Sequence, residues 1–111
     1  MASDKADETE SPFDWDDSKA ESNFRKHGVS FKEASTVLQN ILTDEFPDED
    51  HSITEERWIA IGHSNVGRLI VVSFMDTSNG VRIISARKAT KQEIKEYESS
   101  EKIQRRRYDA P

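Results

Sequence analysis

The stretch of residues 55–89, EERWIAIGHSNVGRLIVVSFMDTSNGVRIISARKA, predicts three consecutive antiparallel strands. Residues 57–63 alternate in polarity and size with a period of two, which is typical of a strand with two different faces. Residues 69–75 form an apolar run without charge, so we expect a central strand that is covered on both faces. Residues 77–80 (TSNG) suit a tight hairpin because asparagine and glycine both tolerate positive φ. Residues 81–88 supply the third strand and carry cations at both ends.

Signals for helix ends flank this meander on both sides. Asp16 is a suitable N-cap for a helix over residues 17–27, and Gly28 suits its left-handed end. The SFKE segment at residues 30–33 is a capping box that begins a second helix, and the TKQE segment at residues 90–93 begins a third. The side chains expected to be buried on the three helices are Ala20, Phe24 and His27, then Phe31, Ala34, Val37, Leu38 and Ile41, and finally Ile94 and Tyr97.

Short extended segments at residues 12–15 and 42–46 are expected to add further strands, the first of them at an edge of the sheet. Together these elements predict a small α+β domain with two N-terminal helices, an antiparallel meander sheet and a C-terminal helix. We expect this domain to span residues 12–104. Residues 1–11 are acidic and lack large apolar side chains, which predicts a disordered tail. Residues 105–111 form a basic C-terminal tail.

The composition fits one small domain of 111 residues, with 33% hydrophobic and 34% charged residues. The sequence has no cysteine, which excludes disulfides, thiolate metal sites and a cysteine nucleophile. No apolar run approaches the roughly 20 residues of a membrane span, and the N-terminus lacks the apolar segment of a signal peptide. We therefore expect a cytoplasmic protein without a membrane partner.

The charge is unevenly distributed along the chain. The formal net charge is -6 at pH 7, which alone argues against nucleic-acid binding. Residues 1–56 hold 5 Lys and Arg against 16 Asp and Glu, whereas residues 57–111 hold 11 against 6. This asymmetry indicates two surfaces with different partners, although acidic side chains that merely solvate a tail and a loop explain part of it.

Several segments together resemble the BrnT family of bacterial type II toxins over roughly residues 13–98. The most specific are KHGVSF at residues 26–31 and RIISARKA at residues 82–89. The shorter matches are Trp15-Asp16 with Lys19, Glu33-Ala34, Glu55-Glu56-Arg57-Trp58, Ile61-Gly62, Glu93 and Tyr97. The acidic N-terminal extension is not part of the usual family core.

The resemblance implies a RelE/ParE-like fold and a ribonuclease that uses neither metal nor cofactor, cleaves RNA, inhibits translation and arrests growth. It also implies neutralisation by a BrnA-type antitoxin with a ribbon-helix-helix domain, so that operator DNA is bound only through the complex of the two proteins. The alternative is a non-enzymatic binding module of the same fold, which acts through a protein partner or in a DNA-binding regulatory complex.

Metal-free RNA cleavage by attack of a 2′-hydroxyl on phosphate needs a base, an acid and cations that offset the charge of the phosphate. Glu56 is the acid/base candidate. The candidate catalytic cations are Arg57, Arg82 and Arg87, because guanidinium groups match the geometry of phosphate and can converge from neighbouring strands. The alternative is that these residues are rim charges in surface ion pairs.

Three further residues are candidates for RNA binding. Trp58 can stack on a base, although packing in the core is the commoner fate of a lone tryptophan. Arg68 can contact phosphate or serve as a rim charge. Lys88 is the third candidate for RNA binding. The histidines are scattered, so we expect no metal site. His27 precedes a helix-ending glycine, and we interpret it as a packing or capping residue.

Arg82 and Arg87 are five residues apart, so a regular strand points them to opposite faces. They can serve one phosphate site only if Arg87 reaches around the strand end or if a bulge near residues 85–86 re-aims it. On that hypothesis, Arg82→Ala and Arg87→Ala should each lower RNA cleavage while leaving the melting temperature nearly unchanged.

Overall fold

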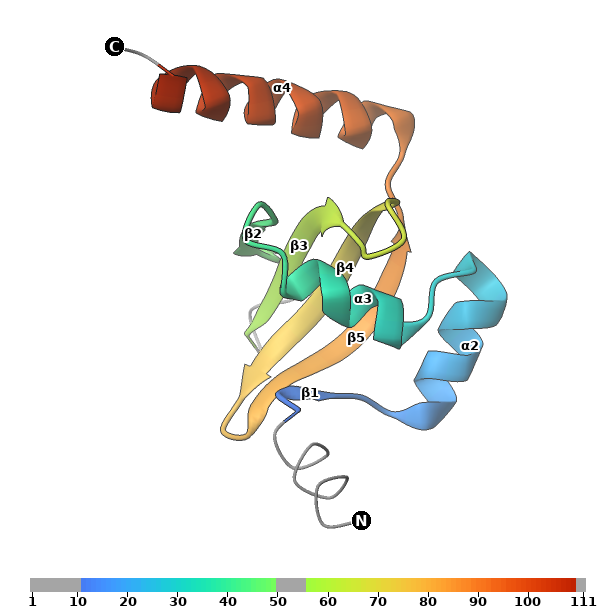
Figure 1. Cartoon of the computed structure of the whole chain (residues 1–111). Coiled ribbons are helices and arrows are strands. Elements are labelled where there is room, and N and C mark those ends of the chain that lie inside the picture. The colour runs from blue at the N-terminus through green and yellow to red at the C-terminus, as the bar shows by residue number, and fades with distance from the viewer. Residues whose placement is uncertain (1–10, 50–55, 110–111) are drawn as a thin grey trace, which may run out of the picture.

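The computed structural model describes residues 11–49 and 56–109, with side chains up to Ser100 (Figure 1). The predicted α+β fold is confirmed, because two helices pack against one face of a five-stranded sheet and a third helix follows the last strand. In chain order the elements are β1 (Phe13–Asp14), α2 (Asp17–His27), α3 (Phe31–Leu38), β2 (Asp44–Pro47), β3 (Arg57–His63), β4 (Leu69–Thr77), β5 (Gly80–Lys88) and α4 (Lys91–Asp109). Within the described residues no helix is both long and apolar enough to cross a membrane.

The sheet is centred on β4, with the strand order β1-β5-β4-β3-β2. The strands β3, β4 and β5 are neighbours and antiparallel, which confirms the predicted meander. The two short extended segments form the two edges: β2 is antiparallel to β3, and β1 is parallel to β5. At the hairpin between β4 and β5, Gly80 has a positive φ of 139°, whereas φ of Asn79 is not positive.

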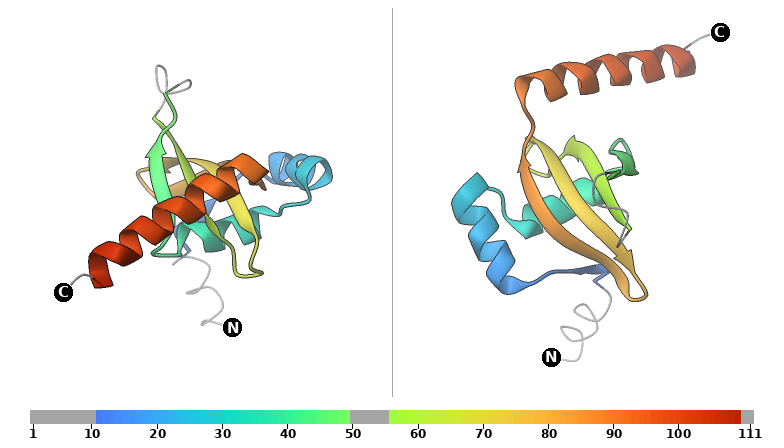
Figure 2. Two further views of the ribbon diagram at one scale, coloured as in Figure 1. Left: turned by 90° about the horizontal axis from the view of Figure 1, so that it is seen from above. Right: turned by 180° about the vertical axis from the view of Figure 1, so that it is seen from behind.

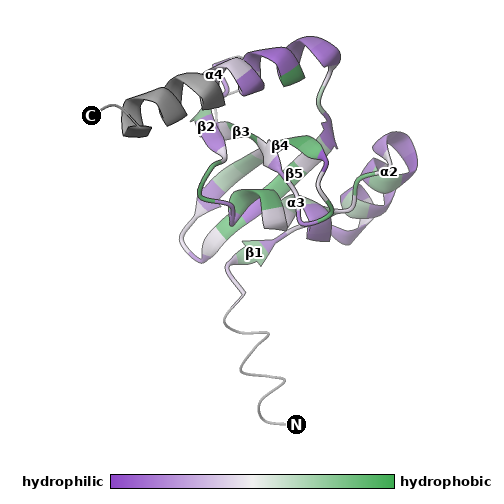
Figure 3. Ribbon diagram, turned by 45° about the horizontal axis from the view of Figure 1, so that its top comes forward, coloured by the Kyte–Doolittle hydropathy of each residue, from purple (hydrophilic) through white to green (hydrophobic). Residues whose placement is uncertain are grey.

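The two faces of the sheet are covered differently. On the helix face, α2 and α3 pack on the strands and enclose the core residues Val29, Phe31, Ala34, Val37, Ala60, Ile70, Val72, Phe74, Ile83 and Ala86. Figure 3 shows apolar residues concentrated on α3 and on the strands next to it. The opposite face, called the open face below, is turned to the viewer in Figure 2 (right). Alternate side chains of β4 are only half-buried there, so the prediction that this strand is covered on both faces is wrong.

The buried stripe of α2 differs from the predicted one. Phe24 is 56% exposed, and Asn23 is buried in its place. The Asn23 amide donates to the carbonyl oxygens of Ala86 at 2.8 Å and of Val29 at 3.0 Å, and its oxygen accepts the Ala86 N–H at 3.1 Å. β1 pairs only with the start of β5, so it forms no hydrogen bonds with the Ala86 N–H and carbonyl oxygen. The Asn23 amide forms them instead. It fixes the second half of α2 beside the end of β5.

The helix α3 begins as predicted, but its capping box is only half formed. The Ser30 hydroxyl accepts the Glu33 N–H at 3.0 Å, whereas the Glu33 carboxylate binds an arginine of the β3–β4 turn. The helix ends at residue 38, and the Asn40 side chain then accepts the N–H of residue 42. This local hydrogen bond turns the chain out of the helix, so Ile41 is 96% exposed instead of buried.

The last helix, α4, is held to the domain mainly through Tyr97, which is buried. The Tyr97 ring packs edge-on against His63, and its hydroxyl donates to the Leu42 carbonyl oxygen at 3.0 Å. Ile94, the second expected anchor, is exposed. The helix continues to Asp109, beyond the predicted domain end at residue 104.

Candidate nucleic-acid interface

A groove of about 240 Å³ lies on the open face, and we call it the central groove. His27 reaches it from the end of α2, Arg57 from the start of β3 and Arg87 from the end of β5. The other lining residues are Asp48, Ile59, Val71, Ser73, Ser85 and Ala86. Two guanidinium groups and an imidazole in one groove can bind a phosphate and transfer a proton.

A β-bulge places both candidate arginines of β5 on the open face. The register of β5 against β4 shifts by one residue, so Ile84 is an extra residue in β5. Arg82 and Arg87 therefore lie opposite β4 residues that are four apart, which point to the same face. The bulge lies one residue before the predicted position. It leaves the two arginines about 13 Å apart along the sheet, and Arg82 pairs with Asp14 of β1 at 2.6 Å.

Arg87 is oriented by Glu93 at the start of α4. Its two terminal nitrogens donate to the two carboxylate oxygens of Glu93 at 2.8 and 2.9 Å. The same carboxylate accepts the Thr90 N–H at 2.8 Å, which completes the predicted capping box. Hydrogen bonding from Arg87 lowers the pKa of Glu93 to about 2 against the effect of desolvation, and the hydrogen bond to Glu93 raises the pKa of Arg87. The Arg87 side chain keeps its charge and orientation while remaining 42% exposed.

Glu93→Gln should remove part of the pH dependence of stability. The lowered pKa means that the Glu93 carboxylate stabilises the fold fully above its ordinary pKa of 4.5, and that this contribution is lost as the pH falls toward about 2. Because both side chains of the ion pair are partly exposed, solvent screening limits the contribution to about 1 kcal/mol. Urea titrations at neutral pH and at about pH 2 measure how much the free energy of unfolding falls on acidification. This fall should be about 1 kcal/mol larger for the parent than for Glu93→Gln.

Glu98→Gln is the control for this measurement, because Glu98 is an exposed residue of the same helix. It should follow the pH dependence of the parent. If the parent and Glu93→Gln lose the same free energy on acidification, the ion pair with Arg87 does not stabilise the fold.

The predicted acid/base residue, Glu56, lies outside the central groove. It is exposed at the position before β3, whereas its neighbour Arg57 lines the groove. Asp48, just after β2, also lines the groove, and its N–H donates to the Arg57 carbonyl oxygen at 2.9 Å. Within the described part of the chain, the carboxylate residue that lines the central groove is therefore Asp48. Among the described residues, no three His, Cys, Asp or Glu side chains are grouped so that they could hold a metal ion.

Two of the residues predicted to bind RNA lie on the helix side of the sheet. Trp58 is opposite Phe74 and packs against the core. Lys88 is opposite Ile70, and the pKa of Glu33 on α3 is lowered mainly by a hydrogen bond from Arg68 and to a small extent by the charge of Lys88. Neither side chain lines the central groove. The structure therefore brings only Arg57 and Arg87 of the predicted site residues together there.

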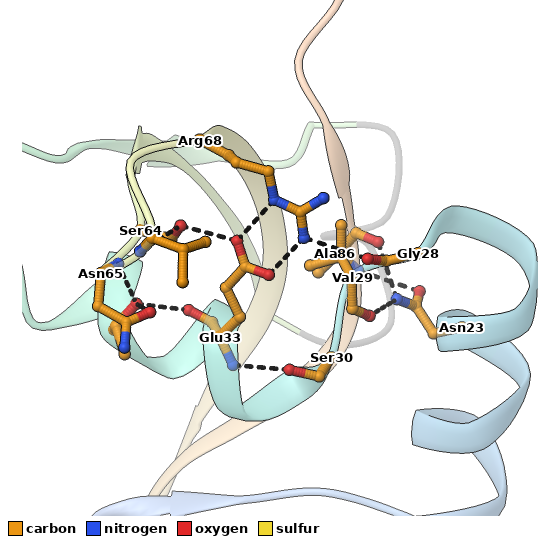
Figure 4. Close-up of polar contacts among 11 residues, drawn as sticks. Asn23, Gly28, Val29, Ser30, Glu33, Ser64, Asn65, Arg68 and Ala86 are labelled. Carbon is orange, nitrogen blue, oxygen red and sulfur yellow. Dashed lines mark hydrogen bonds and ion pairs between the residues drawn. The ribbon is translucent and has the colours of Figure 1, made fainter.

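Arg68, the third of these residues, fastens the turn between β3 and β4 to α3 (Figure 4). Its guanidinium donates to both carboxylate oxygens of Glu33, at 3.0 Å through Nε and also through Nη2, and to the Gly28 carbonyl oxygen at 3.1 Å. The Ser64 hydroxyl donates to the same carboxylate at 2.7 Å. These hydrogen bonds, with that from Arg68 the strongest, lower the pKa of Glu33. Arg68 thus links the β3–β4 turn to α3 by hydrogen bonds within the fold, and we assign no RNA contact to it.

His27 is the candidate residue that the sequence interpretation missed. It is the last residue of α2, before Gly28 with φ 70°, as expected for a helix end, yet it lines the central groove. Asn23, one helical turn earlier, bonds to β5 beside Arg87 and so positions the helix end. The KHGVSF segment was the available signal. A helix pattern alone, however, does not tell which face of a sheet the end of the helix reaches.

Comparisons with known proteins bear on the same residues. The family model described as "Ribonuclease toxin, BrnT, of type II toxin-antitoxin system" matches residues 15–93, a range that includes His27, Arg57 and Arg87. The crystal structure of the Brucella abortus ribonuclease toxin BrnT is similar to this chain, with a TM-score of 0.55 and 29% sequence identity, and the match covers 69% of this chain and 94% of that one. A search of curated proteins found no match.

Proposed function

Because the chain belongs to the BrnT family of ribonuclease toxins of type II toxin-antitoxin systems, we propose that it is an endoribonuclease that needs no metal ion and that its active site is the central groove. The observation that carries this proposal is the convergence of His27, Arg57 and Arg87 from three elements in one groove. These residues supply a proton acceptor and two cations. The hydroxyls of Ser73 and Ser85 line the same groove and can donate hydrogen bonds to an RNA phosphate.

In this mechanism the phosphate of a single-stranded RNA lies between the guanidinium groups of Arg57 and Arg87. His27 takes the proton of the neighbouring 2′-hydroxyl, and that oxygen attacks the phosphorus atom. The bond between phosphorus and the 5′-oxygen breaks, and the 5′-oxygen takes a proton from water. The hydroxide ion that this leaves takes the proton from His27, which restores the neutral imidazole. The two arginines offset the negative charge that develops on the phosphate oxygens. The products are a 2′,3′-cyclic phosphate and a 5′-hydroxyl.

Membership of a type II family implies an antitoxin protein as partner. The proposed partner is a BrnA-type antitoxin with a ribbon-helix-helix domain, and operator DNA is bound only through the complex of the two proteins. Free toxin then cleaves RNA, whereas toxin in the complex does not. Induced expression of this chain without a partner should therefore arrest growth.

The test of the proposed function is cleavage of a single-stranded RNA by the purified protein in EDTA, with the fold checked by circular dichroism. We expect fragmentation, because no step of the mechanism uses a metal ion. Cleavage that appears only when Mg²⁺ is added would contradict the metal-free mechanism. RNA that stays intact under both conditions, with folded protein, would favour a non-enzymatic binding module instead.

A further inference from the structure

A second groove, called the α4 groove below, lies between α4 and the open face and has a volume of about 330 Å³. Its floor is apolar and comes from three strands, with Phe46 of β2, Ile59 and Ile61 of β3 and Val71 of β4. Tyr97 is the aromatic residue of the wall that α4 provides. Seen from above, α4 runs across the sheet (Figure 2, left).

The rim of the α4 groove is acidic. Asp44 of β2 and Glu93 and Glu96 of α4 line it against one cation, Arg87, which is itself bound by Glu93. In the part of the chain that the structure describes, no cation forms an ion pair with Asp44 or Glu96. Glu96 accepts one hydrogen bond, from the neutral side chain of Gln92. The α4 groove therefore disfavours RNA phosphates and favours a cationic ligand.

Large apolar side chains on β2 and in the loop before it are exposed to solvent. Phe46 is 46% exposed, and Leu42 and Ile41 are still more exposed. Because the Tyr97 hydroxyl donates to the Leu42 carbonyl oxygen, the loop that carries Ile41 and Leu42 borders the wall of the groove. Exposed apolar side chains beside a groove with a charged rim are typical of protein-binding surfaces.

We propose that the α4 groove binds a cationic amphipathic segment of a protein partner. Apolar side chains of the segment lie on the floor of the groove, and its Lys or Arg side chains pair with Asp44 and Glu96. This inference rests on the proposed function for its partner, because a toxin of a type II system pairs with an antitoxin protein. Ile59, Val71 and Arg87 line both grooves. A bound segment therefore stands beside the central groove and restricts the access of RNA to Arg87.

The test uses the full chain and two synthetic amphipathic peptides, one with Leu and Lys at helical spacing and one with Leu and Glu. Asp44→Lys has its matched control in Glu45→Lys, because the neighbouring residue of β2 points to the other face of the sheet. Glu96→Lys has its matched control in Glu98→Lys, on the same helix but outside the groove. The Leu/Lys peptide should bind the parent, and Asp44→Lys and Glu96→Lys should each weaken binding roughly tenfold. The controls should weaken it less than about twofold.

On addition of the Leu/Lys peptide, the backbone amide signals of Ile59, Ile61 and Tyr97 should shift in NMR spectra. The inference is overturned if this peptide does not bind the parent, if the Leu/Glu peptide binds as tightly, or if the control variants lose as much affinity as the groove variants. It is also overturned if a single-stranded RNA occupies the α4 groove and shifts the Ile61 and Tyr97 signals.

Catalysis is measured separately in the same variants, so that the two proposals fail in different ways. All four Lys variants should cleave RNA at the rate of the parent, because none of the changed residues lines the central groove. A parent that binds the Leu/Lys peptide as described but cleaves no RNA would refute the proposed function alone. A parent that cleaves RNA but does not discriminate between the two peptides would refute the docking site alone.

Discussion

His27→Ala should lower the rate of RNA cleavage by a factor on the order of 10²–10⁴, the range typical for the loss of a general base. The His27 imidazole lines the central groove beside Arg57 and Arg87, and imidazole is the side chain that exchanges protons most readily near neutral pH. The melting temperature should change little, because the side chain is only partly buried and Gly28 still ends the helix. Initial rates with one single-stranded RNA in EDTA measure the effect.

His63→Ala is the matched control for this variant. His63 lies on the open face at the end of β3, but it does not line the central groove. Its ring contacts Tyr97 with a centroid separation of 5.5 Å, so the substitution should loosen α4 without slowing cleavage. Equal rate losses in the two variants would mean that His27 acts through the fold and not on the RNA.

Arg87→Ala should lower the cleavage rate by a factor on the order of 10²–10³, by analogy with the removal of a group that stabilises a developing oxyanion. The guanidinium lies in the central groove with its plane fixed by Glu93, so it is preorganised for a phosphate. Arg87→Lys keeps the charge but loses the planar set of N–H donors that can bind two phosphate oxygens at once. Its rate should lie between those of the parent and Arg87→Ala.

Two controls separate the role of Arg87 at the phosphate from its role in holding α4. Glu93→Gln breaks the same ion pair but leaves the guanidinium in the groove with its orientation less fixed, so its cleavage rate should fall much less than that of Arg87→Ala. Arg82 lies outside the central groove, and Arg82→Ala should raise KM with little change in kcat, as expected for an RNA contact away from the reacting phosphate. If Glu93→Gln is as slow as Arg87→Ala, Arg87 acts through α4.

The features that the sequence predicted correctly are those that neighbouring residues determine. Asp16 and Gly28 delimit α2 through their own backbone and side-chain geometry, and Thr90 with Glu93 begins α4 in the same way. The alternation in residues 57–63 and the turn before Gly80 were enough to predict the order and direction of the meander strands. In each case the interacting groups are close in the sequence, so their pattern is visible in it.

The features that were predicted wrongly depend on contacts between distant residues. The side chain of Asn23 is buried because it bonds to Ala86, 63 residues away, and an amphipathic pattern favours Phe24 for that position. The alternation of β3 separates its two faces but does not tell which one the helices cover, and for this reason Trp58 could not be placed.

The site depended on the same kind of long-range arrangement. The bulge at Ile84 determines the face of Arg87, and no single residue in the RIISARKA segment marks it. His27 enters the central groove only because α2 packs on β5. The places of Arg57 and Arg87 at strand ends could be predicted from the meander, but the face of the sheet on which they lie could not.

The chemistry of the RNA ends tests the central claim most directly. RNA should be cleaved by the parent in EDTA, and the new ends should then be examined by labelling with polynucleotide kinase before and after phosphatase treatment. Attack by the 2′-hydroxyl in the groove of His27, Arg57 and Arg87 predicts 5′-hydroxyl ends, which accept label directly, and 2′,3′-cyclic phosphates. Both should form more slowly with His27→Ala, by a factor on the order of 10²–10⁴. New ends that carry a 5′-phosphate, or 5′-hydroxyl ends that form equally fast with His27→Ala, would contradict the account.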